Sequence, residues 1–154
     1  MCEITMHPFF KKLRLRKRVK RRTRRTQTGR RDYLKYRSAA RALVNSRLEY
    51  FNQFYNFKYN SVRIKNQRTR WGSCSAKGNL NFSYKLARLS PHQADYIIVH
   101  ELCHIGEFNH SAKFWTLVAK TIPEYKKIRQ ELKRVNLRKG VSIRSSGSEY
   151  IEVD

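Results

Sequence analysis

The chain has 154 residues, enough for one domain with a hydrophobic core, and a formal net charge of +24 from 35 Lys and Arg against 11 Asp and Glu. Its three cysteines are widely spaced, and no apolar run is long enough for a signal-peptide core or a membrane-spanning helix. These features argue against a disulfide-stapled secreted domain and against membrane insertion, so we expect a cytoplasmic protein with anionic partners.

Residues 1–31 are predicted to form a basic, flexible arm. Between Lys11 and Arg31 there are 13 Lys or Arg in 21 positions and no acid. Such a run is usually solvated, and its functional alternative is an electrostatic hold on phosphates. We therefore consider nucleic acid or another polyanion as a partner of the arm. Binding should be weakly sequence-specific, because the run lacks aromatic residues that stack on bases.

The folded domain is predicted to cover residues 32–139, with a flexible tail over 140–154. Its first element is a long helix from Tyr33 to about Tyr55, in which apolar residues recur every three or four positions and Asp32 is the expected N-cap. The aromatic residues near its end are expected in the core rather than in a cofactor site. They are Tyr50, Phe51, Phe54, Tyr55 and Phe57.

Three short strands are predicted next, around Val62 and Ile64, over 69–75 and over 79–84. The segment 75–78 should close a hairpin between the last two, with Gly78 at positive φ. The second strand contains the run R-W-G-S-C-S at 70–75. It reads either as a strand with a Trp anchor and a Gly bulge, or as a strand that borders an active-site cleft and pairs with an extended peptide.

A second helix should begin at Pro91, with Ser90 as N-cap and Gln93 completing a capping box. Its apolar residues Ala94, Ile97, Ile98, Leu102 and Ile105 predict one buried face. Two shorter helices follow, the first capped by Ser111 and the second carrying Tyr125, Ile128, Leu132 and Val135. The predicted class is therefore α+β, with a small three-stranded sheet between helices.

The second helix carries the motif His100-Glu101-Leu102-Cys103-His104. Positions i and i+4 of a helix lie about 40° and about 6 Å apart, so His100 and His104 can bind one metal ion from one face. Glu101 then lies beside the ion, where a carboxylate can take a proton from a metal-bound water. This pattern predicts a catalytic zinc site with Glu101 as the general base.

His110 is the expected third ligand. In a continuous helix it would lie about 9 Å beyond His104 and about 240° around the axis, out of reach of the ion. The helix must therefore end first, and Gly106 can end it by taking the left-handed C′ conformation. Three His ligands leave one position open for water. Glu107 and Cys103 are alternative ligands, although Cys103 is better explained as a small buried residue.

The same spacing of three histidines occurs in metzincins, but two features exclude that class. Metzincins have Gly seven residues after the first His, where this chain has Glu107, and they need a Met-turn downstream. The methionines here are Met1 and Met6, both far upstream of the motif.

Four motifs in order resemble the YgjP-like metallopeptidases, relatives of SprT and of Wss-type proteases with the zincin fold. They are R-W-G-S-C-S at 70–75, G-N-L-N at 78–81, D-Y-I-I-V-H-E-L-C-H at 95–104 and N-H-S-A-K-F-W at 109–115. The resemblance covers roughly residues 60–125. It implies a zincin-like fold, His100, His104 and His110 as Zn²⁺ ligands and Glu101 as the catalytic acid and base. The N-terminus departs from the family pattern, since an Arg/Lys arm and one helix replace a longer β-rich region.

The expected function is zinc-dependent hydrolysis of peptide bonds in protein or peptide substrates, including proteins held on nucleic acid. Two alternatives stay open: a zinc hydrolase of nucleotides or other phosphate-containing molecules, and a non-enzymatic polyanion-binding protein with a structural zinc. Tyr96, one turn before His100, is a candidate to stabilise the oxyanion, with core packing as its alternative role. Glu107 is a candidate to orient a ligand imidazole.

Overall fold

The computed structural model describes residues 24–135, with side chains from residue 29 onward. Its elements in chain order are α1 (Arg24–Tyr55), β1 (Ser61–Lys65), β2 (Gly72–Cys74), β3 (Asn79–Ser83), the 3₁₀ helix η1 (Tyr84–Arg88), α2 (Pro91–Cys103), α3 (Ala112–Thr121) and α4 (Tyr125–Arg134). This order confirms the α+β class, the small sheet and the two C-terminal helices. Most of the predicted arm and the whole predicted tail lie outside the described residues.

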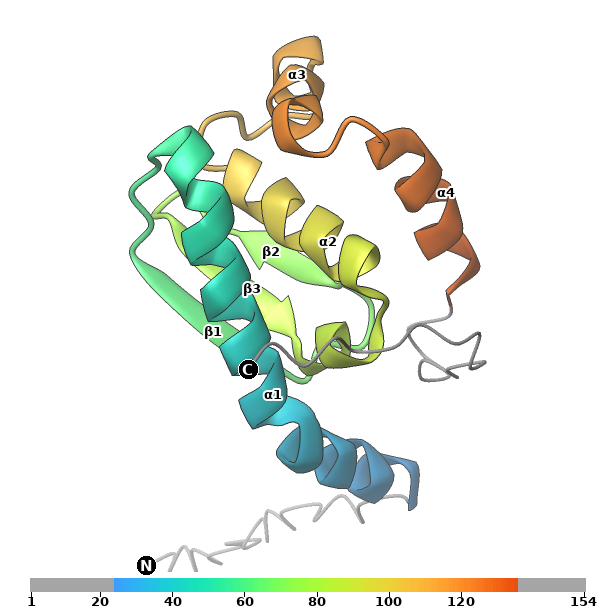
Figure 1. Cartoon of the computed structure of the whole chain (residues 1–154). Coiled ribbons are helices and arrows are strands. Elements are labelled where there is room, and N and C mark those ends of the chain that lie inside the picture. The colour runs from blue at the N-terminus through green and yellow to red at the C-terminus, as the bar shows by residue number, and fades with distance from the viewer. Residues whose placement is uncertain (1–23, 136–154) are drawn as a thin grey trace, which may run out of the picture.

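Helix α1 begins earlier than the sequence pattern predicts. It spans 32 residues from Arg24, so the prediction of a helix start at Tyr33 with Asp32 as N-cap is wrong. The last eight residues of the predicted arm, 24–31, continue the helix instead, and four of them are Arg, a good helix former. In Figure 1 this N-terminal part of α1 extends beyond the rest of the domain.

The buried face of α1 is formed by Ala40, Val44, Leu48 and Phe51, spaced by three or four residues. Tyr50 and Phe54 were expected in the core, but they are 47% and 46% exposed. Their rings instead pack edge to face on the surface of the helix, with centroids 5.8 Å apart. The four buried positions already fill the stripe that faces the domain.

The sheet has the strand order β1-β3-β2, with β1 parallel and β2 antiparallel to β3. The predicted hairpin is confirmed: a turn at Ser75–Gly78 joins β2 to β3, and Gly78 has φ 70°. Leu80 and Phe82 of β3 are fully buried, whereas Asn81 lies between them on the other face and donates to the Ser73 hydroxyl. The sheet therefore has one apolar and one polar face.

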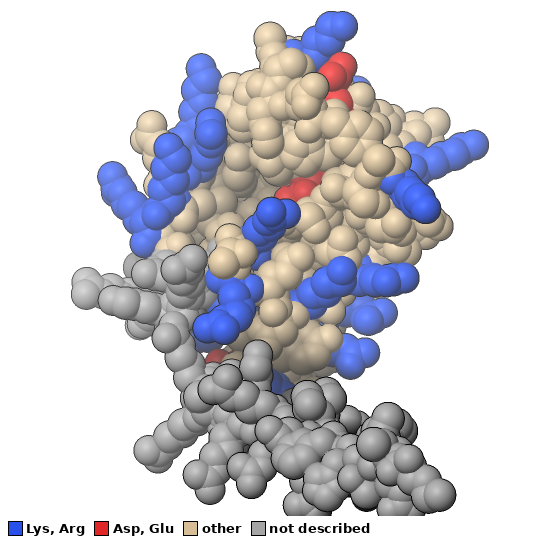
Figure 2. Space-filling view, turned by 180° about the vertical axis from the view of Figure 1, so that it is seen from behind, with Lys and Arg blue, Asp and Glu red and all other residues tan. Residues whose placement is uncertain are grey.

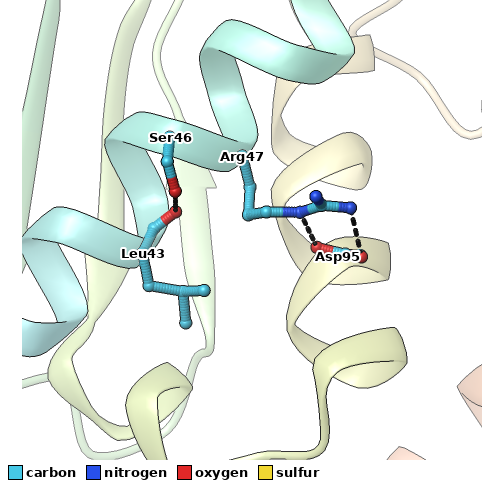
Figure 3. Close-up of polar contacts among 4 residues, drawn as sticks. All are labelled: Leu43, Ser46, Arg47 and Asp95. Carbon is cyan, nitrogen blue, oxygen red and sulfur yellow. Dashed lines mark hydrogen bonds and ion pairs between the residues drawn. The ribbon is translucent and has the colours of Figure 1, made fainter. Parts of the chain in front are cut away.

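Helices α1 and α2 lie side by side on one face of the sheet, and α4 lies on the other side of α2 from α1 (Figure 1). A bidentate ion pair joins the two central helices: Arg47 donates from Nε to Oδ1 of Asp95 at 2.6 Å and from Nη2 to Oδ2 at 2.7 Å (Figure 3). Planar, two-point pairing of this kind fixes orientation as well as distance. It holds α2 in register with α1.

The N-terminus of α2 differs from the expected capping box. Ser90 is the N-cap residue and Pro91 follows it, but the Ser90 side chain makes no capping hydrogen bond. The Gln93 side chain donates to Glu131 of α4 at 3.2 Å, so it is not available to cap the helix. The predicted cap of α3 is confirmed, since the Ser111 hydroxyl accepts from the Phe114 amide.

Candidate metal centre

The three predicted histidines come together at the C-terminal end of α2. One nitrogen from each of His100, His104 and His110 lies within 4.8 Å of the others, a separation that allows one ion to bind all three. The His100 and His110 Nε2 atoms are 3.1 Å apart. Four ligands around a tetrahedral zinc with Zn–N bonds of about 2.0–2.1 Å are separated by similar distances.

The chain reverses after α2 by a different route from the predicted one. The helix ends at Cys103, and the amides of Ile105 and Gly106 then form short-range bonds to Leu102 and Cys103 carbonyls. The predicted left-handed conformation of Gly106 is wrong, because among the described glycines positive φ occurs at Gly78. Glycine is needed at 106 for space: a Cβ there would lie 2.7 Å from Cζ of Phe57.

The imidazole of His104 is oriented by a backbone carbonyl. Its Nδ1 lies 3.1 Å from the carbonyl oxygen of Glu107. A carbonyl oxygen can only accept, so Nδ1 carries the proton and Nε2 offers its lone pair to a metal. Glu107 thus contributes to this site, through its backbone rather than through the carboxylate that the sequence suggested.

The electrostatics favour neutral imidazoles. Burial, with smaller contributions from the neighbouring histidines and Arg129, lowers the pKa of His100 to about 3. The pKa of His104 is also lowered, again mainly by burial. Neutral imidazoles are the form that binds metal. The buried Nδ1 of His100 has no hydrogen-bond partner among the described residues, and the donor set as a whole fits a cation.

Glu101 is buried against β2, with 7% of its surface exposed. A Cβ on Gly72 would lie 2.5 Å from Cγ and 2.7 Å from Oε1 of Glu101, so the carboxylate packs directly on the backbone of this strand. Burial raises the pKa of Glu101 to about 8, against the opposing effect of Arg70. The sequence predicted either a Gly bulge here or a strand that borders the cleft, and neither interpretation includes the contact of Gly72 with Glu101. The one indication in the sequence was the position of Gly72 within the predicted strand at 70–75.

The other candidate residues have clear positions. Cys103 is fully buried and is not part of the histidine cluster, so it does not supply a third ligand. Tyr96 is also buried, and its ring centroid lies 5.7 Å from that of His100. Burial raises the pKa of Tyr96 to about 12, so the phenol keeps its proton at neutral pH.

A cleft of about 340 Å³ has His100, one of the three histidines, in its lining. Trp71 and Gly72 form its β2 side, and Tyr96 lies with His100 and Glu101 along α2. The opposite side comes from α4, which sequence analysis did not connect with the site. Within residues 24–135, no helix is both long and apolar enough to cross a bilayer.

Comparison with known proteins gives a family and two similar structures. The crystal structure of the metallopeptidase zymogen abylysin of Pyrococcus abyssi is 26% identical with a TM-score of 0.54, covering 58% of this chain and 90% of that chain. The zymogen of jannalysin from Methanocaldococcus jannaschii is 23% identical with a TM-score of 0.48, covering 62% of this chain and 94% of that chain. No curated protein matches the sequence.

The family match is more extensive than these structural likenesses. The model of the YgjP-like metallopeptidase domain matches residues 7–135, which include the sheet, the histidine motif and both C-terminal helices. This match confirms the resemblance carried by the four sequence motifs. It also supports the zincin-like fold and a requirement for a divalent metal. The chain therefore belongs to the YgjP-like metallopeptidase domain family.

Proposed function

We propose that this protein is a zinc-dependent peptidase in which His100, His104 and His110 bind the metal and Glu101 is the general base. The observation that carries the proposal is that three imidazole nitrogens lie within 4.8 Å of one another. The buried Glu101 directly follows the first of these histidines in the helix. Family membership supports peptide bonds as the substrate. It disfavours both alternatives, the phosphate-directed hydrolase and the non-enzymatic binding protein.

Zinc is the proposed ion because of the donor set. Three neutral imidazoles suit zinc better than calcium or magnesium, which prefer oxygen ligands. Three protein ligands also leave a coordination position for water or substrate, as in catalytic zinc sites. When bound, zinc would polarise the substrate carbonyl and make water a stronger acid.

The remaining chemistry belongs to the side chains of this protein. The Glu101 carboxylate removes a proton from the attacking water and later gives it to the leaving nitrogen. Burial favours its protonated form, which assists the second of these transfers. The close contact with Gly72 holds the carboxylate in place during both transfers.

Strand β2 is the proposed docking edge for the substrate. It pairs with β3 on one side and is the last strand of the described sheet on the other. Gly72 of this strand lines the cleft together with His100 and Glu101. An extended peptide that pairs with the free edge would therefore pass beside the histidines.

A polyanion remains the proposed partner of the basic N-terminal region. Arg30, Arg31, Lys35, Arg37 and Arg41 are exposed on the described part of α1 and continue the charge of the preceding residues. Such a surface would hold substrates that are bound to nucleic acid. Affinity for a DNA duplex should fall steeply between 50 and about 200 mM salt, and an affinity independent of salt would contradict this proposal.

The decisive experiment compares wild type with Glu101→Gln after zinc loading. The variant should keep one zinc per chain in metal analysis but lose hydrolysis of casein and of quenched peptides by at least about 100-fold. Undiminished hydrolysis would contradict the role of Glu101. Wild-type hydrolysis of nucleotides but not of peptides would instead contradict the proposed substrate class.

A further inference from the structure

Helix α4 brings two positive charges to the cleft that contains His100 and Glu101. Arg129 and Lys133 line this cleft from positions i and i+4, which lie on one face of a helix. Leu132 also lines it and is 8% exposed, so the apolar surface of α4 lies next to its charged face. Neither cation has a role in the chemistry proposed for Glu101.

Contacts with neighbouring aromatic groups fix Arg129. Its guanidinium carbon lies 5.0 Å from the centroid of the Trp115 ring, and the Trp115 ring stacks on Tyr125 with centroids 5.0 Å apart. A guanidinium stacked on a ring loses little further freedom when it binds an anion. Arg129 itself lines the cleft, so its charge is available to a group that binds there.

The charge in and around this cleft is unbalanced. Among the described residues that line it, Glu101 is the one acid. The nearest acid on α4, Glu131, is engaged away from the cleft by the side chains of His92 and Gln93. Figure 2 shows that Lys and Arg side chains are spread over the face of the domain turned away from the viewer in Figure 1, and that acidic side chains are few there. An anionic group entering the cleft would therefore meet two cations of α4 against the single carboxylate of Glu101.

We infer that the α4 end of the cleft binds a carboxylate of the substrate, so that the enzyme prefers peptides with an acidic group close to the scissile bond. This inference rests on the proposed peptidase function. The group is an Asp or Glu side chain or a free C-terminal carboxylate, which share the same chemistry.

The dimensions and lining of the cleft favour a peptide carboxylate over a nucleic acid. Its volume of about 340 Å³ suits a few side chains, not a duplex. Apolar surface from Tyr96, Ile97 and Leu132 accompanies the cations, and it matches the methylene groups of a glutamate. A nucleic acid would need only charged residues at the rim of the cleft, and it would make no use of this apolar lining.

Quenched peptides that differ by Glu, Gln or Lys at one position test the preference. Each position around the scissile bond is scanned, with amidated and free C-termini to separate the two sources of carboxylate. We expect kcat/KM to be about tenfold higher for Glu than for Gln at one position, or for the free over the amidated terminus, at low salt. The double variant Arg129→Gln/Lys133→Gln should bring that ratio to about one.

Lys126→Gln is the matched control, because Lys126 is an exposed cation of the same helix and does not line the cleft. It should keep the tenfold ratio. Equal kcat/KM for the Glu, Gln and Lys peptides at every position, and for both termini, would overturn the inference while leaving the peptidase function intact. The inference would also be overturned if added salt lowered kcat/KM by the same factor for all of the peptides.

A binding measurement separates this inference from the proposed function. Glu101→Gln should bind the acidic peptide about tenfold more tightly than its Gln counterpart in fluorescence anisotropy, whether or not wild type cleaves it. Absence of cleavage by wild type, with this preference intact, would contradict the peptidase function alone. Equal binding of the two peptides would contradict the carboxylate site.

Discussion

The two parts of the histidine cluster are held in different ways. His100 lies in the last turn of α2 and His104 is its C-cap residue, and this helix packs against α1, the sheet, α3 and α4. His110 follows an exposed turn, and its ring is held by the edge of Phe114 at 4.8 Å and by stacking on Trp115 at 5.5 Å. Helical periodicity places the first two, whereas contacts with the aromatic rings of α3 place the third. The turn should therefore be the weaker part of the metal site.

The largest effect should come from displacing the carboxylate of Glu101, which is carried by α2. Gly72→Ala places a Cβ 2.5 Å from Cγ of Glu101, so the carboxylate has to move. We expect kcat to fall by about 100-fold, the cost of a displacement near 1 Å, with zinc content unchanged. Kinetics with quenched peptides and metal analysis measure the two quantities.

Ser73→Ala is the control for that change, because the Ser73 hydroxyl bonds to Asn81 on the other face of the sheet. It should leave kcat within a factor of about two of wild type. A Gly72→Ala enzyme of normal kcat would show that the carboxylate is not held by this strand.

A smaller effect is expected where the exposed turn meets the core. Gly106→Ala should lower zinc affinity by about 10- to 100-fold, because the new Cβ lies 2.7 Å from Cζ of Phe57 and the turn carrying His110 must shift. Since Gly106 does not have positive φ, alanine adds no backbone strain there. Competition with a chelator measures the affinity.

The second substitution Phe57→Leu should restore part of this affinity by relieving the contact. An unaltered affinity in the single variant would mean that the turn tolerates the shift, and that the contrast between helix and turn is smaller than proposed.

The smallest effect should follow from removing the stacked ring. Trp115→Leu should lower zinc affinity by up to about tenfold, since His110 then loses the flat surface that limits its rotation. Trp115→Phe keeps a ring and should retain most of the affinity. Identical affinities of the Leu and Phe variants would assign the position of His110 to Phe114 and the backbone instead.

Features that depend on local spacing could be predicted from sequence. The histidine pair on α2, the hairpin turn at Gly78 and the Ser111 cap of α3 all follow from residues within one or two turns of one another. The need for the helix to end before His110 also followed, from helix geometry alone. The predicted meeting of the three histidines agrees with the structure.

Features that depend on distant contacts could not be predicted. Gly106 is constrained by Phe57, nearly fifty residues earlier, and Gly72 by a side chain of α2. The exposure of Tyr50 and Phe54 depends on which stripe of α1 faces the sheet and α2. The cations of α4 join the cleft through the packing of α4 on α2, which no motif encodes.

Strand β2 has three residues, so its free edge is only about 10 Å long. A polypeptide aligned along it would have to be fully stretched over that distance, with its own hydrogen bonds already broken. Native globular proteins seldom expose an extended segment without hydrogen-bond partners, whereas damaged proteins, nascent chains and chain termini do. The rate at which a given protein is cleaved would then depend on how often that protein unfolds locally.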